Sequence, residues 1–129
     1  MADVTPDPVM RIALGFMAAK HLFVASAVGL FEALNSDSAT LDELTSKCGV
    51  PRRTLGISAD AMASLGLVER DGDRDRNSAV ARAFLAGASG PDLRPMLRFW
   101  DRISYPAWLR LEATLSLPDA SAKVPSPLR

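Results

Sequence analysis

The sequence predicts a mainly α-helical chain built around a winged helix-turn-helix, with a small two-stranded wing and additional helices at both ends. The first indication is the order of residues 40–77, which read as a capped helix, a second helix opened by Pro51, and a charged hairpin. The second is composition: aromatic content is only 6% while Ala and Leu are frequent, which is typical of a finely packed helical core. A chain of 129 residues has room for a single core of this kind.

The N-terminal part of the chain is its most apolar segment. Residues 1–7 are expected to be disordered, and Pro8 suits the first turn of a helix with Asp7 as its N-cap. Polar residues are scarce between Ile12 and Phe31, so this segment must be covered on nearly all sides. Because so short a chain has little material for that cover, we expect a homodimer with N- and C-terminal dimerisation helices. The predicted interface residues are Met10, Leu14, Met17, His21, Leu22, Val28 and Phe31.

The apolar run from Ile12 to Leu34 approaches the length of a membrane span. Lys20 and His21 lie in its middle, and a charge at the bilayer centre costs roughly 2.5–3.5 kcal/mol. We therefore expect no membrane partner, and a break into two helices near Lys20–Leu22 or at Gly29. The single cysteine and the lack of a basic N-terminal signal favour a cytoplasmic protein.

The helix-turn-helix has clear local signals. Thr40 and Glu43 have the spacing of a capping box, and Gly49 is placed to end that first helix. Pro51 opens the second helix, and Gly66 is its expected left-handed stop. Its predicted buried stripe is Leu55, Ala59, Met62 and Leu65.

The predicted wing follows directly. Residues 67–70 alternate like a strand, Asp71-Gly72 is a hairpin-turn dipeptide, and residues 74–76 return. Ser78 then caps a short helix. The predicted winged-helix dimerisation domain spans residues 8–115.

The last long helix is expected to begin at Asp92 and to be interrupted by Pro106 near Tyr105. Residues 116–129 read as a flexible tail or linker stub. The helix carries an aromatic set that suits a flat organic ligand, although packing within the protein explains it as well. Its members are Phe99, Trp100, Tyr105 and Trp108.

Charge argues against nucleic acid as the main partner. Fifteen basic and fifteen acidic residues cancel, and the wing alternates Arg with Asp, so its cations are expected to pair within the chain. Arg52 and Arg53 at the start of the second helix keep a DNA-binding winged-helix regulator as an alternative.

Catalytic and cofactor chemistry has little basis in these residues. His21 lies in the apolar run and Cys48 on the inward stripe of a short helix, so both are expected to be packing residues. The spacing of His, Cys and carboxylates predicts no metal site, and no G-x-G loop for a cofactor is present. We therefore predict neither catalytic residues nor a bound cofactor for this chain.

Several short segments resemble, in their order, the start of the small-molecule O-methyltransferases, which are plant-type enzymes and relatives in bacterial antibiotic pathways. The resemblance extends from Pro8 to Glu112. Its segments include Pro8-Val-Met-Arg-Ile12, Ala39-Thr-Leu-Asp-Glu-Leu44, Leu65-Gly-Leu-Val68 and Leu93-Arg-Pro-Met-Leu-Arg-Phe-Trp100. In that family this region is a winged-helix domain that interlocks two subunits and closes over the acceptor substrate.

The resemblance implies that Phe16, Met17, Trp100 and Trp108 touch an aromatic or polyketide-like substrate of natural-product biosynthesis. The family's S-adenosylmethionine domain has no counterpart here. Methyl transfer is therefore expected only with a catalytic domain or chain supplied elsewhere. Asp75 stands where the family pattern suggests tyrosine, which implies a loosened or remodelled wing. A stand-alone module that binds or transforms aromatic ligands remains a further alternative.

Overall fold

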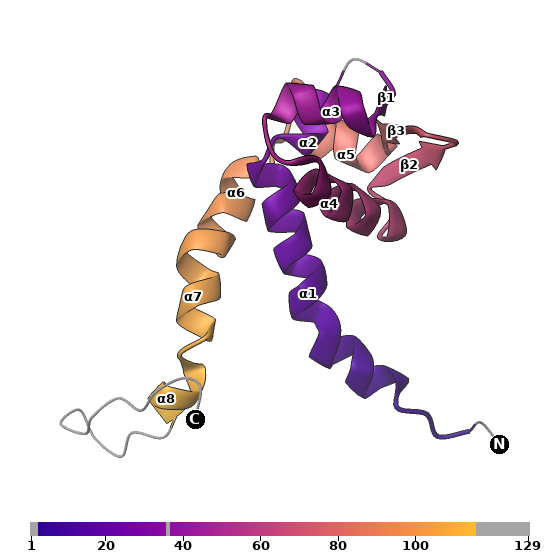
Figure 1. Cartoon of the computed structure of the whole chain (residues 1–129). Helices are drawn as coiled ribbons and strands as arrows, with labels where there is room; N and C mark the ends of the chain where they lie inside the picture. The colour runs from indigo at the N-terminus through magenta and orange to yellow at the C-terminus, as the bar shows by residue number, and fades with distance from the viewer. Residues whose placement is uncertain (1–2, 36, 116–129) are drawn as a thin grey trace. The chain divides into compact units, whose positions relative to one another are not determined.

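The computed structural model describes residues 3–35 and 37–115, which form mainly helices and a small antiparallel sheet (Figure 1). The chain divides into two compact units, residues 1–94 and residues 95–129. Residues 1–2 of the expected disordered start and the expected tail 116–129 lie outside the described residues. The first unit contains α1 (Asp7–Ala27), α2 (Leu30–Ala33), β1 (Ala39–Thr40), α3 (Leu41–Cys48), α4 (Arg52–Ser64), β2 (Val68–Asp71), β3 (Arg74–Asn77) and α5 (Ala79–Phe84).

The apolar N-terminal run is one continuous helix, α1, followed by a turn and the short α2. Pro6, not Asp7, is the N-cap residue, and Pro8 lies in the first turn. The chain passes through Lys20–Leu22 without a break and ends α1 at Ala27. Gly29, with φ of 83°, then takes the left-handed conformation that lets the chain turn into α2. Of the two predicted breaks, the one at Gly29 is confirmed.

The predicted helix caps of the helix-turn-helix are confirmed. The amide of Glu43 donates to Thr40 Oγ1 at 3.2 Å, and the amide of Thr40 donates to Glu43 Oε1 at 3.0 Å. At the end of α4, Gly66 has φ of 83°, and its amide bonds the carbonyl of Ala63. The amide of the next residue, Leu67, reaches back to Met62. These two bonds are the pair expected for a glycine-terminated helix.

The sheet has three strands in the order β1-β3-β2, so the wing is larger than the predicted two strands. Ala39 and Thr40 pair with Asp75 and Arg74 of β3. A strand of two residues is too short to show an alternating pattern, and here it overlaps the cap of α3. The hairpin loop is Gly72-Asp73, one residue later than predicted, because β2 and β3 close on an Asp71–Arg74 pair.

The core of the first unit lies where α2, α3, α4 and the sheet meet. Its largest fully buried side chains are Leu30, Phe31, Leu44, Leu55, Met62 and Asn77. The side-chain amide of Asn77 donates to the carbonyl of Phe31 at 2.9 Å, which joins β3 to α2. The predicted stripe of α4 is buried except at Leu65, which is half exposed. Cys48 is only partly buried, and burial raises the pKa of its thiol, with a smaller contribution from Glu32.

The predicted C-terminal helix is interrupted, as expected, but begins at Arg94 instead of Asp92. It runs as α6 (Arg94–Phe99), a π-helical segment η1 (Trp100–Ser104), α7 (Tyr105–Trp108) and α8 (Leu111–Leu115). The amide of Tyr105 bonds the carbonyl of Trp100, five residues back. Pro106 has no amide to donate and crowds the preceding turn, which accounts for the wider geometry just before it.

Replacing Phe31 with Ala is expected to destabilise the isolated chain by about 3–5 kcal/mol, because the ring is fully buried and its removal leaves a cavity. Chemical denaturation followed by circular dichroism measures this. The loss should not depend on protein concentration, since the cavity lies inside one chain. A loss below about 1 kcal/mol would contradict this placement of the ring.

Candidate dimerisation surface

Helix α1 exposes most of its apolar side chains to solvent in the single chain. Ile12 is 83% exposed and Phe16 is 54% exposed. Soluble proteins rarely leave a contiguous apolar surface of this kind without a partner. The exposed apolar face of α1 consists of Val9, Met10, Ile12, Leu14, Phe16 and Met17.

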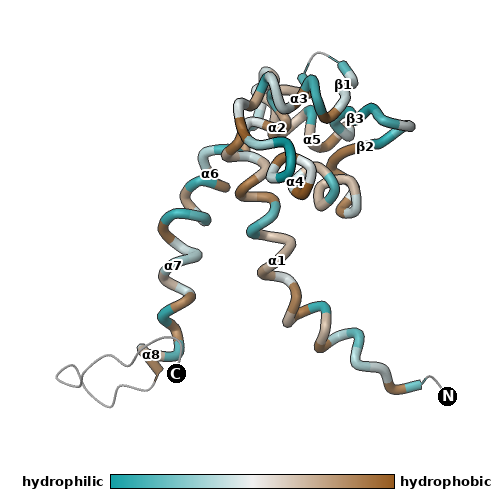
Figure 2. The backbone as a smooth tube through the Cα atoms, viewed as in Figure 1, coloured by the Kyte–Doolittle hydropathy of each residue, from teal (hydrophilic) through white to brown (hydrophobic). Residues whose placement is uncertain are grey.

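The C-terminal end of α1 is anchored in the first unit. Phe23 and Ala25 are its buried residues, and the helix packs against α4 and α2. Apolar residues nevertheless recur along the whole helix (Figure 2), and the large ones from Val9 to Met17 are 44% to 83% exposed. A helix held at one end and apolar beyond it presents a preformed surface for association.

By length and composition alone, α1 also meets the criteria for a membrane-crossing helix, and it is the one helix among the described residues that does so. The core helix of a soluble protein and an N-terminal signal sequence pass the same test. Lys20 and His21 fall in the second half of α1, where a lipid environment would have to accommodate them.

The predicted interface residues fall into three groups. Met10, Leu14 and Met17 are exposed on α1, as an interface requires. Three others are partly buried, namely His21, Leu22 and Val28. Phe31 differs from the expectation: it has no exposed surface, because α2 folds back into the core of its own chain, so its ring is not available to a partner.

The predicted substrate-contact residues lie in both units. Phe16 and Met17 are exposed neighbours on α1, while Phe99, Trp100 and Trp108 are exposed in the second unit and Tyr105 is partly buried there. Within the second unit, only Trp108 of this set lines an open apolar hollow. The other lining residues are Leu109, Leu111, Glu112 and Leu115. Sequence reasoning missed this hollow because it depends on the turn between α7 and α8.

The wing is tied to α4 by a shared arginine. Arg70 on β2 pairs with Asp75 through two bonds, Nε–Oδ1 at 2.7 Å and Nη2–Oδ2 at 3.2 Å, and with Asp60 of α4 at 2.8 Å. Asp75 is 5% exposed, so this carboxylate is taken from solvent and satisfied by Arg70. Hydrogen bonds from Arg70 to Asp75, and then to Asp60, raise the pKa of the guanidinium further. The expectation of a loosened wing is therefore wrong, because Asp75 holds β3 to Arg70 of β2.

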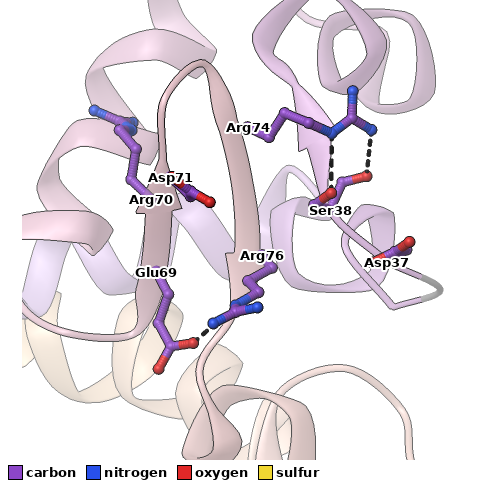
Figure 3. Close-up of a pocket in the computed structure, with 7 residues that line it drawn as sticks. All are labelled: Asp37, Ser38, Glu69, Arg70, Asp71, Arg74 and Arg76. Atoms are coloured by element: carbon purple, nitrogen blue, oxygen red, sulfur yellow. Dashed lines mark hydrogen bonds and ion pairs between the residues drawn. The ribbon is translucent and has the colours of Figure 1, made fainter.

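The remaining wing arginines are also engaged within the chain. A small cavity of about 150 Å³ lies between the hairpin and residues 37–38 (Figure 3). On its walls, Arg74 donates to Oγ and to the carbonyl of Ser38, both at 2.9 Å. Arg74 also forms an ion pair with Glu43, and Arg76 donates to Glu69 at 3.0 Å. The cations of the wing thus face acids and carbonyls of their own unit.

A third arginine cluster holds the end of the first unit. Arg94 bonds Asp92 through two nitrogens at 2.9 Å and Glu32 of α2 at 3.0 Å. Gly87, with φ of 84°, leaves space for this guanidinium, since an added Cβ would lie 3.2 Å from Nη2. Among the described residues no group of three or more His, Cys, Asp or Glu could hold a metal ion.

Replacing Asp75 with Ala should lower the free energy of unfolding by about 1–3 kcal/mol, because it removes a buried carboxylate that Arg70 satisfies. Replacing Glu69 with Gln is the matched control. Its pair with Arg76 is exposed on both sides and should contribute less than about 1 kcal/mol. Urea denaturation of both variants measures the difference. Equal losses in the two would show that burial of Asp75 contributes nothing.

Comparison with known proteins agrees with this architecture. The family model of the O-methyltransferase dimerisation domain matches residues 10–87. A 3-hydroxy-5-methyl-1-naphthoate 3-O-methyltransferase of Streptomyces sahachiroi is 31% identical over 96% of this chain and 36% of its own length. The tetracenomycin polyketide synthesis 8-O-methyl transferase TcmO of Streptomyces glaucescens is 30% identical over 94% of this chain and 35% of its own.

Solved structures show the same fold. PigF with SAH superposes with a TM-score of 0.80 at 25% identity, over 88% of this chain and 33% of PigF. Human N-acetylserotonin methyltransferase in complex with SAM gives a TM-score of 0.79 at 24% identity, over 89% and 35%. The chain spans about a third of the length of these relatives and matches their N-terminal part. It belongs to the O-methyltransferase dimerisation-domain family.

Proposed function

We propose that this chain forms a homodimer through the exposed apolar face of α1 and acts as the substrate-capping part of a natural-product O-methyltransferase. The observation that carries the proposal is a dimerisation-domain fold whose first helix is left largely uncovered by its own chain. The S-adenosylmethionine chemistry would come from a catalytic domain outside these 129 residues. In this proposal the described residues form the dimer contacts and part of the surface that touches the acceptor substrate.

The physical case for self-association is the amount of apolar surface on α1. Burying such surface stabilises a complex by roughly 25 cal/mol per Å² before association costs are subtracted. A second copy supplies an identical apolar helix, and a two-fold arrangement lets each chain cover the other. The same arrangement removes the need for a lipid environment and fits a cytoplasmic protein.

The case for an aromatic substrate comes from the exposed aromatic side chains and from the relatives. Trp100 and Trp108 offer large flat surfaces with one N–H group each. The relatives named above act on a hydroxylated naphthoate and in tetracenomycin polyketide synthesis. A hydroxylated polycyclic aromatic is therefore the class of acceptor that we propose for the complete enzyme.

The alternative of a DNA-binding regulator is not favoured. Phosphate contacts require free lysine and arginine side chains. In this chain Arg52 pairs with Asp42 at 2.8 Å, and Arg70, Arg74 and Arg76 are each held by partners in their own unit. Arg53 is exposed and takes part in none of these pairs, but one arginine alone supplies little affinity for a phosphate backbone.

Replacing Leu14 with Asp should raise the dimer dissociation constant by about tenfold or more, because it places a charge in an apolar contact. Leu14 is exposed in the single chain, so the fold itself should survive. Sedimentation velocity over a micromolar concentration series measures the dissociation constant. The control is Val4→Asp, which adds the same charge at a fully exposed position before α1. A wild-type chain that stays monomeric throughout would contradict the proposal.

Titration with a hydroxynaphthoate should quench or shift the fluorescence of the two tryptophans, since both lie at the proposed substrate surface. Trp108→Phe, in the apolar hollow, and Trp100→Phe, outside it, show which ring reports binding. Benzoate serves as the small-ring control. No change with a panel of polycyclic aromatics would count against substrate contact by this region.

A further inference from the structure

The chain leaves the first unit through a loop whose two ends are bonded to each other. Residues 85–92 follow α5, and the amide of Leu93 donates to the carbonyl of Phe84 at 2.9 Å, which closes this loop. Inside it, Gly87 and Gly90 have φ of 84° and 114°, conformations that favour glycine. The loop therefore ends at a fixed place beside α5, immediately before α6 begins.

Arg94 adds a long-range bond at this point. Its Nε and Nη2 both donate to the carboxylate of Asp92 at 2.9 Å, and its Nη1 donates to Glu32 Oε2 of α2 at 3.0 Å, 62 positions away in the sequence. The side chain of Arg94 is 26% exposed, against 62% for Arg76 in the wing. Water and salt therefore screen these bonds less than they screen the surface pair of Arg76. We call Glu32, Asp92 and Arg94 the Arg94 anchor.

The anchor lies where the chain passes from the first unit to the second. The first unit ends at Arg94 and the second begins at Pro95, so α6 has its first residue in one unit and the remainder in the other. The amide of Arg94 bonds Asp92 Oδ1 at 3.0 Å, which means that its backbone is held as well as its side chain. Proline confines φ near about −65°, and Pro95 thereby stiffens the step from the anchor into α6.

We propose that the Arg94 anchor limits how far the second unit swings about the loop of residues 85–92. The two glycines open many backbone conformations to this loop, and the bonds from Arg94 to Glu32 and Asp92 select one of them. Arg94 acts through α6 and is a positioning residue. The inference does not depend on dimerisation. Its bearing on acceptor binding rests on the proposed function, because α6 leads into η1, which begins at Trp100.

Pulsed electron paramagnetic resonance on the full 129-residue chain tests the limit directly. Nitroxide labels on Ser64→Cys and Arg110→Cys, both at exposed positions, report one distance between the units in a Cys48→Ala background. An excess of unlabelled chain removes distances between copies. Arg94→Ala should broaden the distance distribution, because it releases α6 from α2. A distribution as narrow as that of the wild-type chain would overturn the inference.

Three further variants show whether the anchor itself is responsible. Glu32→Ala removes the same bond from the other side and should broaden the distribution as Arg94→Ala does. Arg94→Lys keeps the charge but cannot form the bidentate contact with Asp92, so its width should fall between the two. Arg98→Ala is the matched control, since it removes an exposed arginine one turn further along α6. Equal broadening by Arg98→Ala would also overturn the inference.

Hydrogen exchange separates a released joint from a general loss of stability. In Arg94→Ala, residues 85–93 should exchange about tenfold faster or more, because the charged bonds that hold the end of the loop are lost. Residues of α4 should keep their protection. Lost protection throughout the first unit would show that the anchor holds the core instead of the joint, and the inference would fail. Neither measurement uses a ligand or a dimer, so failure here leaves the proposed function untouched.

Discussion

Helix α1 carries more apolar surface than its own chain covers. Its C-terminal end is fixed by Phe23 and Ala25, whereas Ile12 and Phe16 remain 83% and 54% exposed. Water is a poor solvent for a helix that is apolar on nearly every side. The proposed dimer would resolve the conflict, since a second copy would cover the surface that one chain leaves exposed.

The pairing of charges within the first unit explains how this winged helix can support protein contacts without attracting nucleic acid. Its arginines are held by neighbouring acids and carbonyls, with Arg70 joining Asp75 of the wing to Asp60 of α4. These bonds fix the hairpin on the helix and also neutralise the charges that a nucleic acid would need. Compared with winged helices that bind DNA, this chain has the same architecture, but most arginines of its helix-turn-helix and wing are paired within the chain.

Sequence reasoning succeeded where the signal is local. The capping box at Thr40 and the stop at Gly66 depend on a few neighbouring residues, and both are present in the structure. It failed where contacts join distant segments. β1 forms only because β3 lies beside it, and Phe31 turns inward because α2 folds back into the core. The apolar pattern predicted that a partner chain would cover this ring, whereas its own chain buries it completely.

Hydrogen exchange of α1, read by mass spectrometry at concentrations above and below the dimer dissociation constant, tests the central claim most directly. Amides in residues 9–17 are expected to be protected in the concentrated sample and to exchange much faster on dilution. Amides of α3 and α4 that hold the core of the first unit should keep most of their protection. Protection of residues 9–17 that is unchanged by dilution to a demonstrated monomer would contradict the account.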